Sequence, residues 1–469
     1  MDATRARTLT LVATILGSGI ALLDGTIVNV ALPAIQDDLG GGLAGQQWVV
    51  NAYLLTLGSL ILIGGSLGDL YGERRIFALG VAGFGVASVL CAIAPTIETL
   101  VAARAVQGVT SALLTPASLA LIATTFEDEK ERGAAIGTWT AWGGIAAVAG
   151  PIAGGQIVDV TSWRWIFAVN VPLVAITLAL IYFAVERGGT TERKGRRIDV
   201  VGAVLTALGL AGPVFALVEQ PKRGWTSPVV LVGLIGGAIL LAAFVVWERR
   251  TRDPMLPLGL FRSRNFSFTN VETLLVYAGL SSLFFFLTIF LQTVAGYSAL
   301  ESGLAGLPVT IFLFFLSSRI GALSSRFGPR LFMGVGPLIA AAGVLLLVRV
   351  DENVDYFVDL LPPMIVFGAG LALTVAPLTS TVMAEAGRGD SGIASGINNA
   401  VARVAGLLGI AVVGVAVAGR SGAELDLAGF RLGMVMTAAV VGAGGLVGLL
   451  GIRNPTLAPD EERVVSSAS

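Results

Sequence analysis

Apolar runs of membrane-spanning length follow one another along almost the whole of this chain of 469 residues. A helix needs about 20 apolar residues to cross the hydrocarbon core of a bilayer. Because lipid offers no partners for backbone N–H and C=O groups, the predicted fold class is an all-α polytopic membrane protein with 14 transmembrane helices. The runs lie near residues 8–33, 44–67, 75–95, 98–122, 134–158, 163–184, 199–218, 227–247, 265–294, 302–322, 331–349, 358–383, 393–418 and 430–452.

Composition supports this class and narrows the chemistry. Hydrophobic residues make up 55% of the chain and charged residues 13%, with a mean hydropathy of +0.84, which excludes an ordinary soluble protein. The net charge of -1 shows no bias toward nucleic acid. There is no histidine, so proton transfer would depend on carboxylates. No metal-ligand cluster appears in the sequence either, and we expect no bound metal and no cofactor.

A charged turn flanked by glycine occurs once in each half of the chain. The first copy spans residues 65–75 (GSLGDLYGERR) and a weaker copy, residues 321–330 (GALSSRFGPR), follows about 256 residues later. Such a repeat in a membrane protein predicts two related bundles that move around a central site, as in secondary transporters. The expected domains are a six-helix bundle at 8–190, a two-helix insertion with cytoplasmic linkers at 191–264, a six-helix bundle at 265–452 and a polar tail at 453–469.

Basic residues indicate the orientation. About 22 of the 30 lie on the side that would hold both termini and about 6 on the other side, so the positive-inside rule places both termini in the cytoplasm. The run at 8–33 follows two arginines, as in a signal peptide, but it is too long and contains Asp24. We expect a retained first helix and a multi-pass protein of the inner (cytoplasmic) membrane.

Five segments carry motif-like patterns: residues 23–33 (LDGTIVNVALP) in the first run, the loop at 65–75, residues 100–108 (LVAARAVQG), residues 150–155 (GPIAGG) and residues 163–172. Together they resemble the first-helix signature, the loop between helices two and three, the fourth-helix motif, the antiporter motif of helix five and the start of helix six in the 14-helix drug:proton antiporter family of the major facilitator superfamily. The departures are Ala146, where the fifth-helix motif has glycine, and Leu70 and Glu73, where the loop motif has basic residues. The resemblance covers the N-terminal half in family order and implies a multidrug efflux antiporter, linked to antibiotic resistance, with the proton as the coupling ion.

Asp24 and Arg104 are charged residues inside apolar runs. Asp24 lies about 16 residues, or about 24 Å, into the first run, in the outer half of the bilayer. A charge at that depth faces a water-filled cavity or a partner, and Arg104 is the expected partner. We predict a proton switch at Asp24, and the resemblance implies a proton-coupling role for Arg104. The alternatives are an outer vestibule or a packing hydrogen bond for Asp24, and a structural brace for Arg104.

Glu272 is the clear intramembrane acid of the C-terminal half, about 7 residues, or about 10 Å, into the ninth run. It would hold a second proton or face a cationic substrate. Alternatively, its side chain would extend to the inner interface. This expectation depends on placement alone, because no family motif includes the residue.

The resemblance implies that residues of the first charged turn act at a cytoplasmic gate. A carboxylate at a helix end can pair with a neighbouring helix in one conformation only, which biases alternating access. The alternative is a turn that only fixes topology. The predicted gate residues are Gly65, Asp69, Gly72, Arg74 and Arg75.

The helix-five motif combines a bend with a flat helix face, because proline removes one backbone hydrogen bond and glycines permit close packing. In the resembling family it seals the interface between the halves and opposes proton leak. The residues are Gly150, Pro151, Gly154 and Gly155.

The predicted function is secondary active export of a lipophilic, cationic drug or toxic compound from an apolar cavity by alternating access. The alternatives are export of an endogenous antibiotic, lipid or metabolite, and a uniporter or scramblase without proton coupling. The three lysines lie outside any phosphate-binding loop motif, which argues against an ATP-driven pump or enzyme on this chain. We expect a monomer in the bilayer with small-molecule substrate and protons as partners. The cavity candidates are Asn29, Tyr53, Gln107, Trp142, Phe285 and Asn399.

Overall fold

A computed structural model describes residues 3–185, 198–385, 387–422 and 424–454, without the side chains of 387–391. Within these ranges, 14 helical segments are long and apolar enough to cross a membrane, as the sequence predicted. The first run is longer than expected, because its helix extends to both sides of 8–33. The first bundle comprises α1 (Ala3–Leu39), α2 (Gly42–Tyr71), α3 (Glu73–Ala92), α4 (Ile97–Thr125), α5 (Glu129–Val160), the short α6 (Trp165–Ala168) and α7 (Asn170–Ala184).

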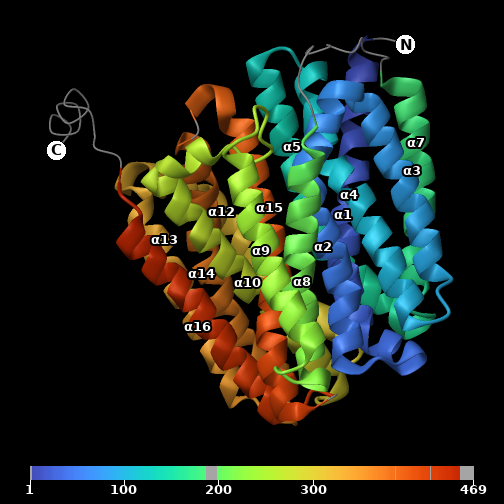
Figure 1. The fold of residues 1–469 in the computed structure, drawn as a ribbon, viewed down its shortest axis with the longest axis vertical. Coiled ribbons are helices and arrows are strands. Elements are labelled where there is room, and N and C mark those ends of the chain that lie inside the picture. The colour runs from blue at the N-terminus through green and yellow to red at the C-terminus, as the bar shows by residue number, and fades with distance from the viewer. Residues whose placement is uncertain (1–2, 186–197, 386, 423, 455–469) are drawn as a thin grey trace.

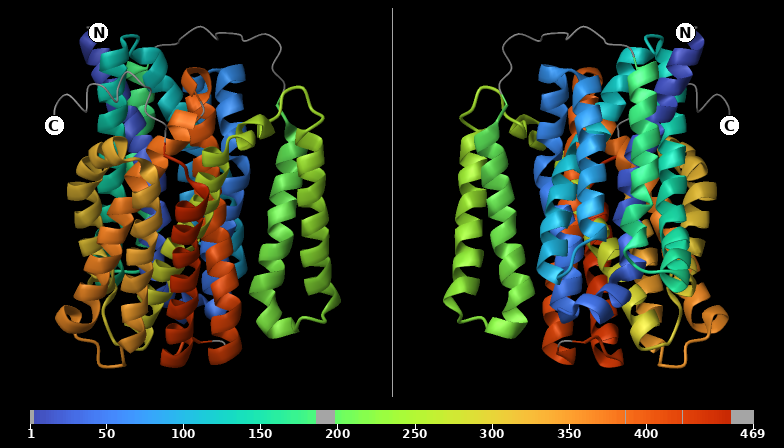
Figure 2. Two further views of the ribbon diagram at one scale, coloured as in Figure 1. Left: turned by 90° about the vertical axis from the view of Figure 1, so that its left-hand side faces the viewer. Right: turned by 90° about the vertical axis from the view of Figure 1, so that its right-hand side faces the viewer.

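The second bundle follows an additional helical hairpin. The hairpin comprises α8 (Val200–Arg223) and α9 (Pro228–Glu248), and it stands beside the two bundles (Figures 1 and 2). A connector with a 3-10 turn, Leu258–Arg262, leads on to the second bundle. This bundle comprises α10 (Arg264–Thr293), α11 (Ala299–Leu304), α12 (Leu307–Phe327), α13 (Pro329–Leu346) with a 3-10 turn (Leu347–Arg349), a π turn (Tyr356–Leu360), α14 (Leu361–Glu385), α15 (Gly387–Ser421) and α16 (Leu427–Gly451).

The start of α1 and the end of α16 point to the same end of the molecule: in Figure 1, α1 begins at the top, and α16 runs upward to the left and ends lower than α1 begins. We call this the termini end and the opposite end the distal end. The helices run between these two ends, so depth along each helix can be counted from its terminal residues at 1.5 Å per residue.

The two copies of the charged turn adopt matching conformations at the termini end. Gly72 has a φ of 91° and Gly328, 256 residues later, has a φ of 84°, a region that only glycine occupies readily. Two residues after each glycine, an arginine donates to carbonyls at the end of another helix of its own bundle. Arg74 donates to the carbonyl of Ile181 at 3.2 Å, and Arg330 donates to that of Leu449 at 2.8 Å. The turns therefore fasten helices within each bundle.

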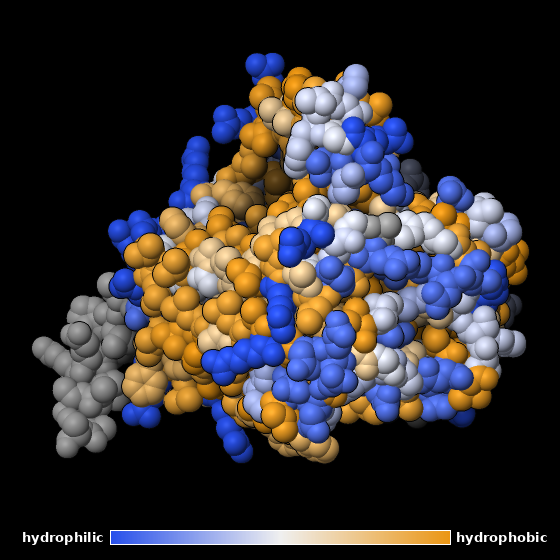
Figure 3. Space-filling model, turned by 90° about the horizontal axis from the view of Figure 1, so that it is seen from below, coloured by the Kyte–Doolittle hydropathy of each residue, from blue (hydrophilic) through white to orange (hydrophobic). Residues whose placement is uncertain are grey.

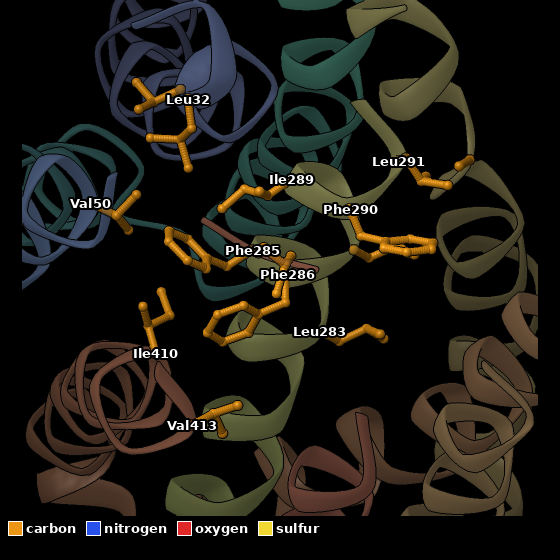
Figure 4. Packing of buried hydrophobic residues seen from close by; sticks show 14 of the residues in the cluster. Leu32, Val50, Leu283, Phe285, Phe286, Ile289, Phe290, Leu291, Ile410 and Val413 are labelled. Atoms are coloured by element: carbon orange, nitrogen blue, oxygen red, sulfur yellow. The ribbon is translucent and has the colours of Figure 1, made fainter. Parts of the chain in front are cut away.

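The two bundles meet tightly at the distal end. Buried apolar side chains of both bundles form one cluster there, including Leu32 and Val50 from the first and Phe285, Ile289 and Ile410 from the second (Figure 4). Seen from this end, side chains fill the centre of the surface (Figure 3). The distal side of the interface is therefore closed.

The termini half of the interface is more open beside α5. There α5 packs on α1 along one side, and most of its other residues are exposed. The Trp142 side chain, for example, is 52% exposed. On α12, Phe314 is 70% exposed and Ile311 is 52% exposed. By contrast, α2 and α15 stay in contact past mid-depth, where Leu62 lies beside Gly396. The molecule is thus closed distally and spread apart between α5 and α12.

Candidate functional site

The densest polar cluster inside the first bundle surrounds Asp24 of α1. One guanidinium nitrogen of Arg104 on α4 donates to Asp24 Oδ2 at 2.5 Å. The two side chains are 0% and 1% exposed, respectively. A charge in this setting requires a partner, and the pair satisfies both members.

The second carboxylate oxygen of Asp24 is also occupied. Gln107 of α4 donates to Oδ1 at 2.9 Å and Asn170 of α7 donates to the same atom at 3.1 Å. Both amides also donate to the hydroxyl of Ser88 on α3, at 3.0 and 3.3 Å. Asp24 therefore accepts three hydrogen bonds from two helices, and the cluster joins α1, α3, α4 and α7.

Arg104 is held from the other side by α2. Its Nε donates to the carbonyl of Val49 at 3.1 Å, and its guanidinium lies 4.4 Å from the ring centroid of Tyr53, within cation–π range. Tyr53 in turn donates to the carbonyl of Ala21 at 3.2 Å. Because α2 also contacts the second bundle, any change in the Asp24–Arg104 pair reaches the interface between bundles through α2.

The network can act as a binary electrostatic switch. Adding a proton to Asp24 cancels the charge that balances Arg104, and the arginine is then buried without a counter-ion. Breaking a buried pair in this way costs about 3–5 kcal/mol. Each tenfold change in an equilibrium constant corresponds to about 1.4 kcal/mol. If one conformation bears this cost and the other does not, the equilibrium between them shifts by about two to three and a half powers of ten.

Glu272 lies outside this network. Its side chain is 0% exposed, and neither carboxylate oxygen has a hydrogen-bond partner in the described residues. A Cβ added to Gly448 of α16 would lie 2.9 Å from Glu272 Oε2, so the carboxyl group points into the second bundle. The alternative in which the side chain extends to the interface is therefore wrong.

The predicted cavity residues separate into three groups. Tyr53 and Gln107 belong to the buried network around Asp24. Phe285 is fully buried in the distal apolar cluster. Asn29 and Asn399 are partly exposed, and Trp142 lies on the open part of α5. The structure therefore does not gather these candidates around one cavity.

The predicted gate residues lie at the junction of α2 and α3. Gly65 and Asp69 are in the last two turns of α2, Gly72 forms the turn, and Arg75 is exposed. Arg74, as described above, binds carbonyls of α7 within its own bundle. For Arg74 the observed role in this conformation is to fasten α3 to α7.

The helix-five motif brings α5 against both bundles. A Cβ on Gly150 would collide with Thr26 of α1, and one on Gly154 with Ile27. On the other face, a Cβ on Gly155 would lie 2.5 Å from the Cα of Leu300 in α11, and one on Gly303 would lie 2.5 Å from the carbonyl oxygen of Pro151. The motif therefore permits the close distal contact between the two bundles.

Asp159, one residue before the end of α5, adds a polar contact across this interface. Its two carboxylate oxygens accept hydrogen bonds from the backbone N–H groups of Ala299 and Leu300, at 3.0 and 2.9 Å. A carboxylate at a helix N-terminus is stabilised both by the free N–H groups and by the helix dipole. Asp159 thus ties the first bundle to α11 of the second.

Sequence reasoning missed Asn170, Ser88 and Asp159 as site residues. The available signal for Asn170 was a lone amide beside a long apolar run, where polar groups seek inward partners. Ser88 carried a weaker signal, because serine is common in membrane helices. For Asp159 there was none, because its partners are backbone N–H groups of a distant segment.

The family model for the Major Facilitator Superfamily matches residues 14–410. The chain belongs to the Major Facilitator Superfamily. Puromycin resistance protein pur8 of Streptomyces alboniger is 40% identical over 87% of this chain and 81% of its own length. Multidrug resistance protein Stp of Mycobacterium tuberculosis (strain CDC 1551 / Oshkosh) is 36% identical over 90% and 78%, respectively. Membership of this family makes the chain a membrane transporter rather than an enzyme.

Solved structures agree with this fold. The crystal structure of an auto-inhibited POT family peptide transporter matches with a TM-score of 0.71, covering 97% of this chain and 98% of that one. At 15% sequence identity, the match supports the shared fold alone.

Proposed function

We propose that this protein exports lipophilic small molecules in exchange for protons by alternating access, with Asp24 as the proton-binding group. The observation that carries the proposal is the fully buried Asp24–Arg104 pair, linked through Val49 and Tyr53 to a helix at the interface between bundles. Relatives that carry puromycin and multidrug resistance in their names support drug export.

The proposed cycle uses the two charge states of Asp24. With both termini in the cytoplasm of the cell, as the basic residues favour, the conformation described here is closed toward the outside. The substrate enters from the cytoplasm or the inner leaflet while Asp24 is paired with Arg104. Proton binding removes this pairing, and the cost of an uncompensated Arg104 drives the return between access states.

This arrangement also bears on the charge of the substrate. A cation benefits from a carboxylate only if that carboxylate is accessible, and Arg104 covers Asp24 in this conformation. We propose that a cationic substrate binds within reach of Asp24 only after the pair has opened, so that substrate and proton compete for one negative charge. A neutral lipophilic substrate needs no such opening.

The decisive test is transport by purified protein in proteoliposomes under an imposed pH gradient. We expect Asp24→Asn to abolish proton-driven transport, while thermal unfolding in detergent shows that it still folds. Asp38→Asn is the matched control, because Asp38 lies on the same helix and pairs with Arg164 at the exposed distal end. Normal proton-driven transport by Asp24→Asn would remove this residue from the mechanism.

A second candidate function is self-protection by export of one particular antibiotic, since pur8 is named for resistance to a single compound. The fold and the proton site would be the same. Competition experiments with a chemically diverse set of lipophilic drugs separate the two: a narrow substrate profile favours self-protection, and a broad one favours multidrug export.

A further inference from the structure

A cavity of about 350 Å³ lies between the α8–α9 hairpin and the two bundles, beside the direct contacts of α8 with α2 and α15. Its volume is within the ~300–1,000 Å³ typical of small-molecule sites. The cavity is distinct from the Asp24 network, and it touches the hairpin, the connector and helices of both bundles. Its walls include Thr206 and Phe244 of the hairpin, Met255 and Phe261 of the connector, Val271 of α10 and Val401 of α15.

The cavity offers few hydrogen-bond donors to an occupant. Its three most polar lining side chains already donate to carbonyl oxygens of the protein. The Thr206 hydroxyl donates to Gly202 at 2.9 Å, the Ser267 hydroxyl to Phe261 at 2.6 Å, and the Asn270 amide to Phe266 at 2.8 Å. No charged residue lines the space. Such walls suit hydrocarbon, because any polar group placed there would lose its hydrogen bonds to water.

The cavity runs from the membrane surface into the hydrocarbon region. Met255 lies on the connector at the termini end, whereas Thr206 is six residues, or about 9 Å, into α8. Gly58, on the opposite wall, is 13 residues, or about 20 Å, from the end of α2. An elongated apolar occupant with one end at the surface matches these depths.

The connector, which contributes Met255 and Phe261 to the cavity wall, carries an excess of positive charge, with four arginines against Asp253. Four arginines of the connector are exposed, and none has an acidic partner in the part of the chain that the structure describes. They are placed before and after the cavity-lining residues Met255 and Phe261. Clusters of arginine next to membrane helices attract the phosphate groups of anionic lipids. These arginines are Arg249, Arg250, Arg252 and Arg262.

We propose that this cavity binds one acyl chain of an anionic phospholipid, whose phosphate group is held by the connector arginines. The hydrocarbon fills the space between hairpin and bundles, and the headgroup lies at the termini end of the membrane. The bound lipid joins the hairpin to α2 of the first bundle and to α10 and α15 of the second.

The first test measures lipid binding to the delipidated full-length protein by native mass spectrometry. Dioleoylphosphatidylglycerol is expected to bind on the order of tenfold more tightly than dioleoylphosphatidylcholine, since arginines near the surface favour anionic headgroups. Val271→Trp places an indole in the cavity and should abolish the tight site for either lipid. Val232→Trp, at a 71% exposed position of α9, is the matched control and should bind like the wild type.

The second test separates the headgroup from the acyl chain without touching the cavity wall. Arg252→Gln with Arg262→Gln should weaken phosphatidylglycerol binding on the order of tenfold and leave phosphatidylcholine unchanged. Arg5→Gln with Arg326→Gln removes the same charge from other exposed positions at the termini end and should have no effect. Equal binding of the two lipids, or full binding by Val271→Trp shown to be folded, would overturn the proposal.

Discussion

The contact between Asp159 and α11 gives the sharpest test of how the distal end closes. Asp159 accepts two backbone hydrogen bonds from the second bundle. The N-terminus of α11 does not depend on Asp159 for its own folding, because the Ser298 side chain caps it in a capping box with Glu301. Replacing Asp159 should therefore weaken the contact between bundles and leave α11 intact.

The size of the effect follows from the geometry. Loss of a capping carboxylate costs about 1 kcal/mol, with a range of about 0.5–2. Because Asp159 is exposed to solvent, we place the free energy of its contact with α11 near the centre of that range. Asp159→Ala should thus raise the ratio of distally open to distally closed molecules about fivefold. Asp159→Asn retains one acceptor oxygen, so we expect about half of this free-energy change.

Spin labels at exposed distal positions of the two bundles, Asp37 and Glu352, would report the two populations by double electron–electron resonance. The native Cys91 is fully buried and should not react with the label. The measurement is made at a pH at which the wild type shows both distances. Asp38→Ala serves as the control, because Asp38 binds Arg164 and Trp163 of its own bundle. Unchanged populations in Asp159→Ala, or an equal shift in Asp38→Ala, would refute the assignment.

Three further predictions concern other contacts. Asn170→Ala removes one hydrogen bond to the Asp24 carboxylate and should lower stability by about 1.5–3 kcal/mol, measured by denaturation in detergent; no loss would show that the bond contributes little. Gly155→Val places a side chain against the backbone of α11 and should enrich the distally open state, seen as reduced distal cross-linking. The pKa of Asp426 is held below its usual range by the hydrogen bond from the Ser421 hydroxyl, so this residue stabilises the fold above about pH 4 and loses its contribution as the pH falls through the depressed value. Asp426→Asn should accordingly flatten the acid limb of the stability profile, and an unchanged limb would contradict this.

The fold was largely predictable because the hydrocarbon core imposes one simple requirement on sequence. Runs of about 20 apolar residues must be helices, and the copies of the charged turn at Gly72 and Gly328 mark equivalent junctions in the two bundles. The pairing of Asp24 with Arg104 could be predicted for a similar reason, since two opposite charges at similar depth in the membrane have few other partners.

The rest of the site depends on helix rotation, which hydropathy does not encode. Glu272 and Asp24 are both acids inside apolar runs. Among the described residues, Glu272 points into the second bundle without a hydrogen-bond partner, whereas Asp24 accepts three hydrogen bonds. Phe285 was expected in a cavity because it is aromatic, but an aromatic ring serves equally well in an apolar seal. Only the packing of neighbouring helices distinguishes these outcomes.

Helix α1 connects the Asp24 network to the distal closure. Asp24 lies near its centre, and Val30, six residues or about 9 Å further along, accepts a hydrogen bond from Gln292 of the second bundle at 3.0 Å. Between them, Thr26 and Ile27 lie against Gly150 and Gly154 of α5, the same helix that binds α11 through Asp159. A small rotation of α1 on loss of the Asp24–Arg104 pair would therefore displace both distal contacts at once. Few hydrogen bonds cross the apolar cluster between the two bundles at this end. The bundles can therefore separate there without leaving many buried polar groups without hydrogen bonds. Under the proposed mechanism, a buried ion pair next to an apolar closure with few hydrogen bonds would let the charge of one proton control access at the distal end.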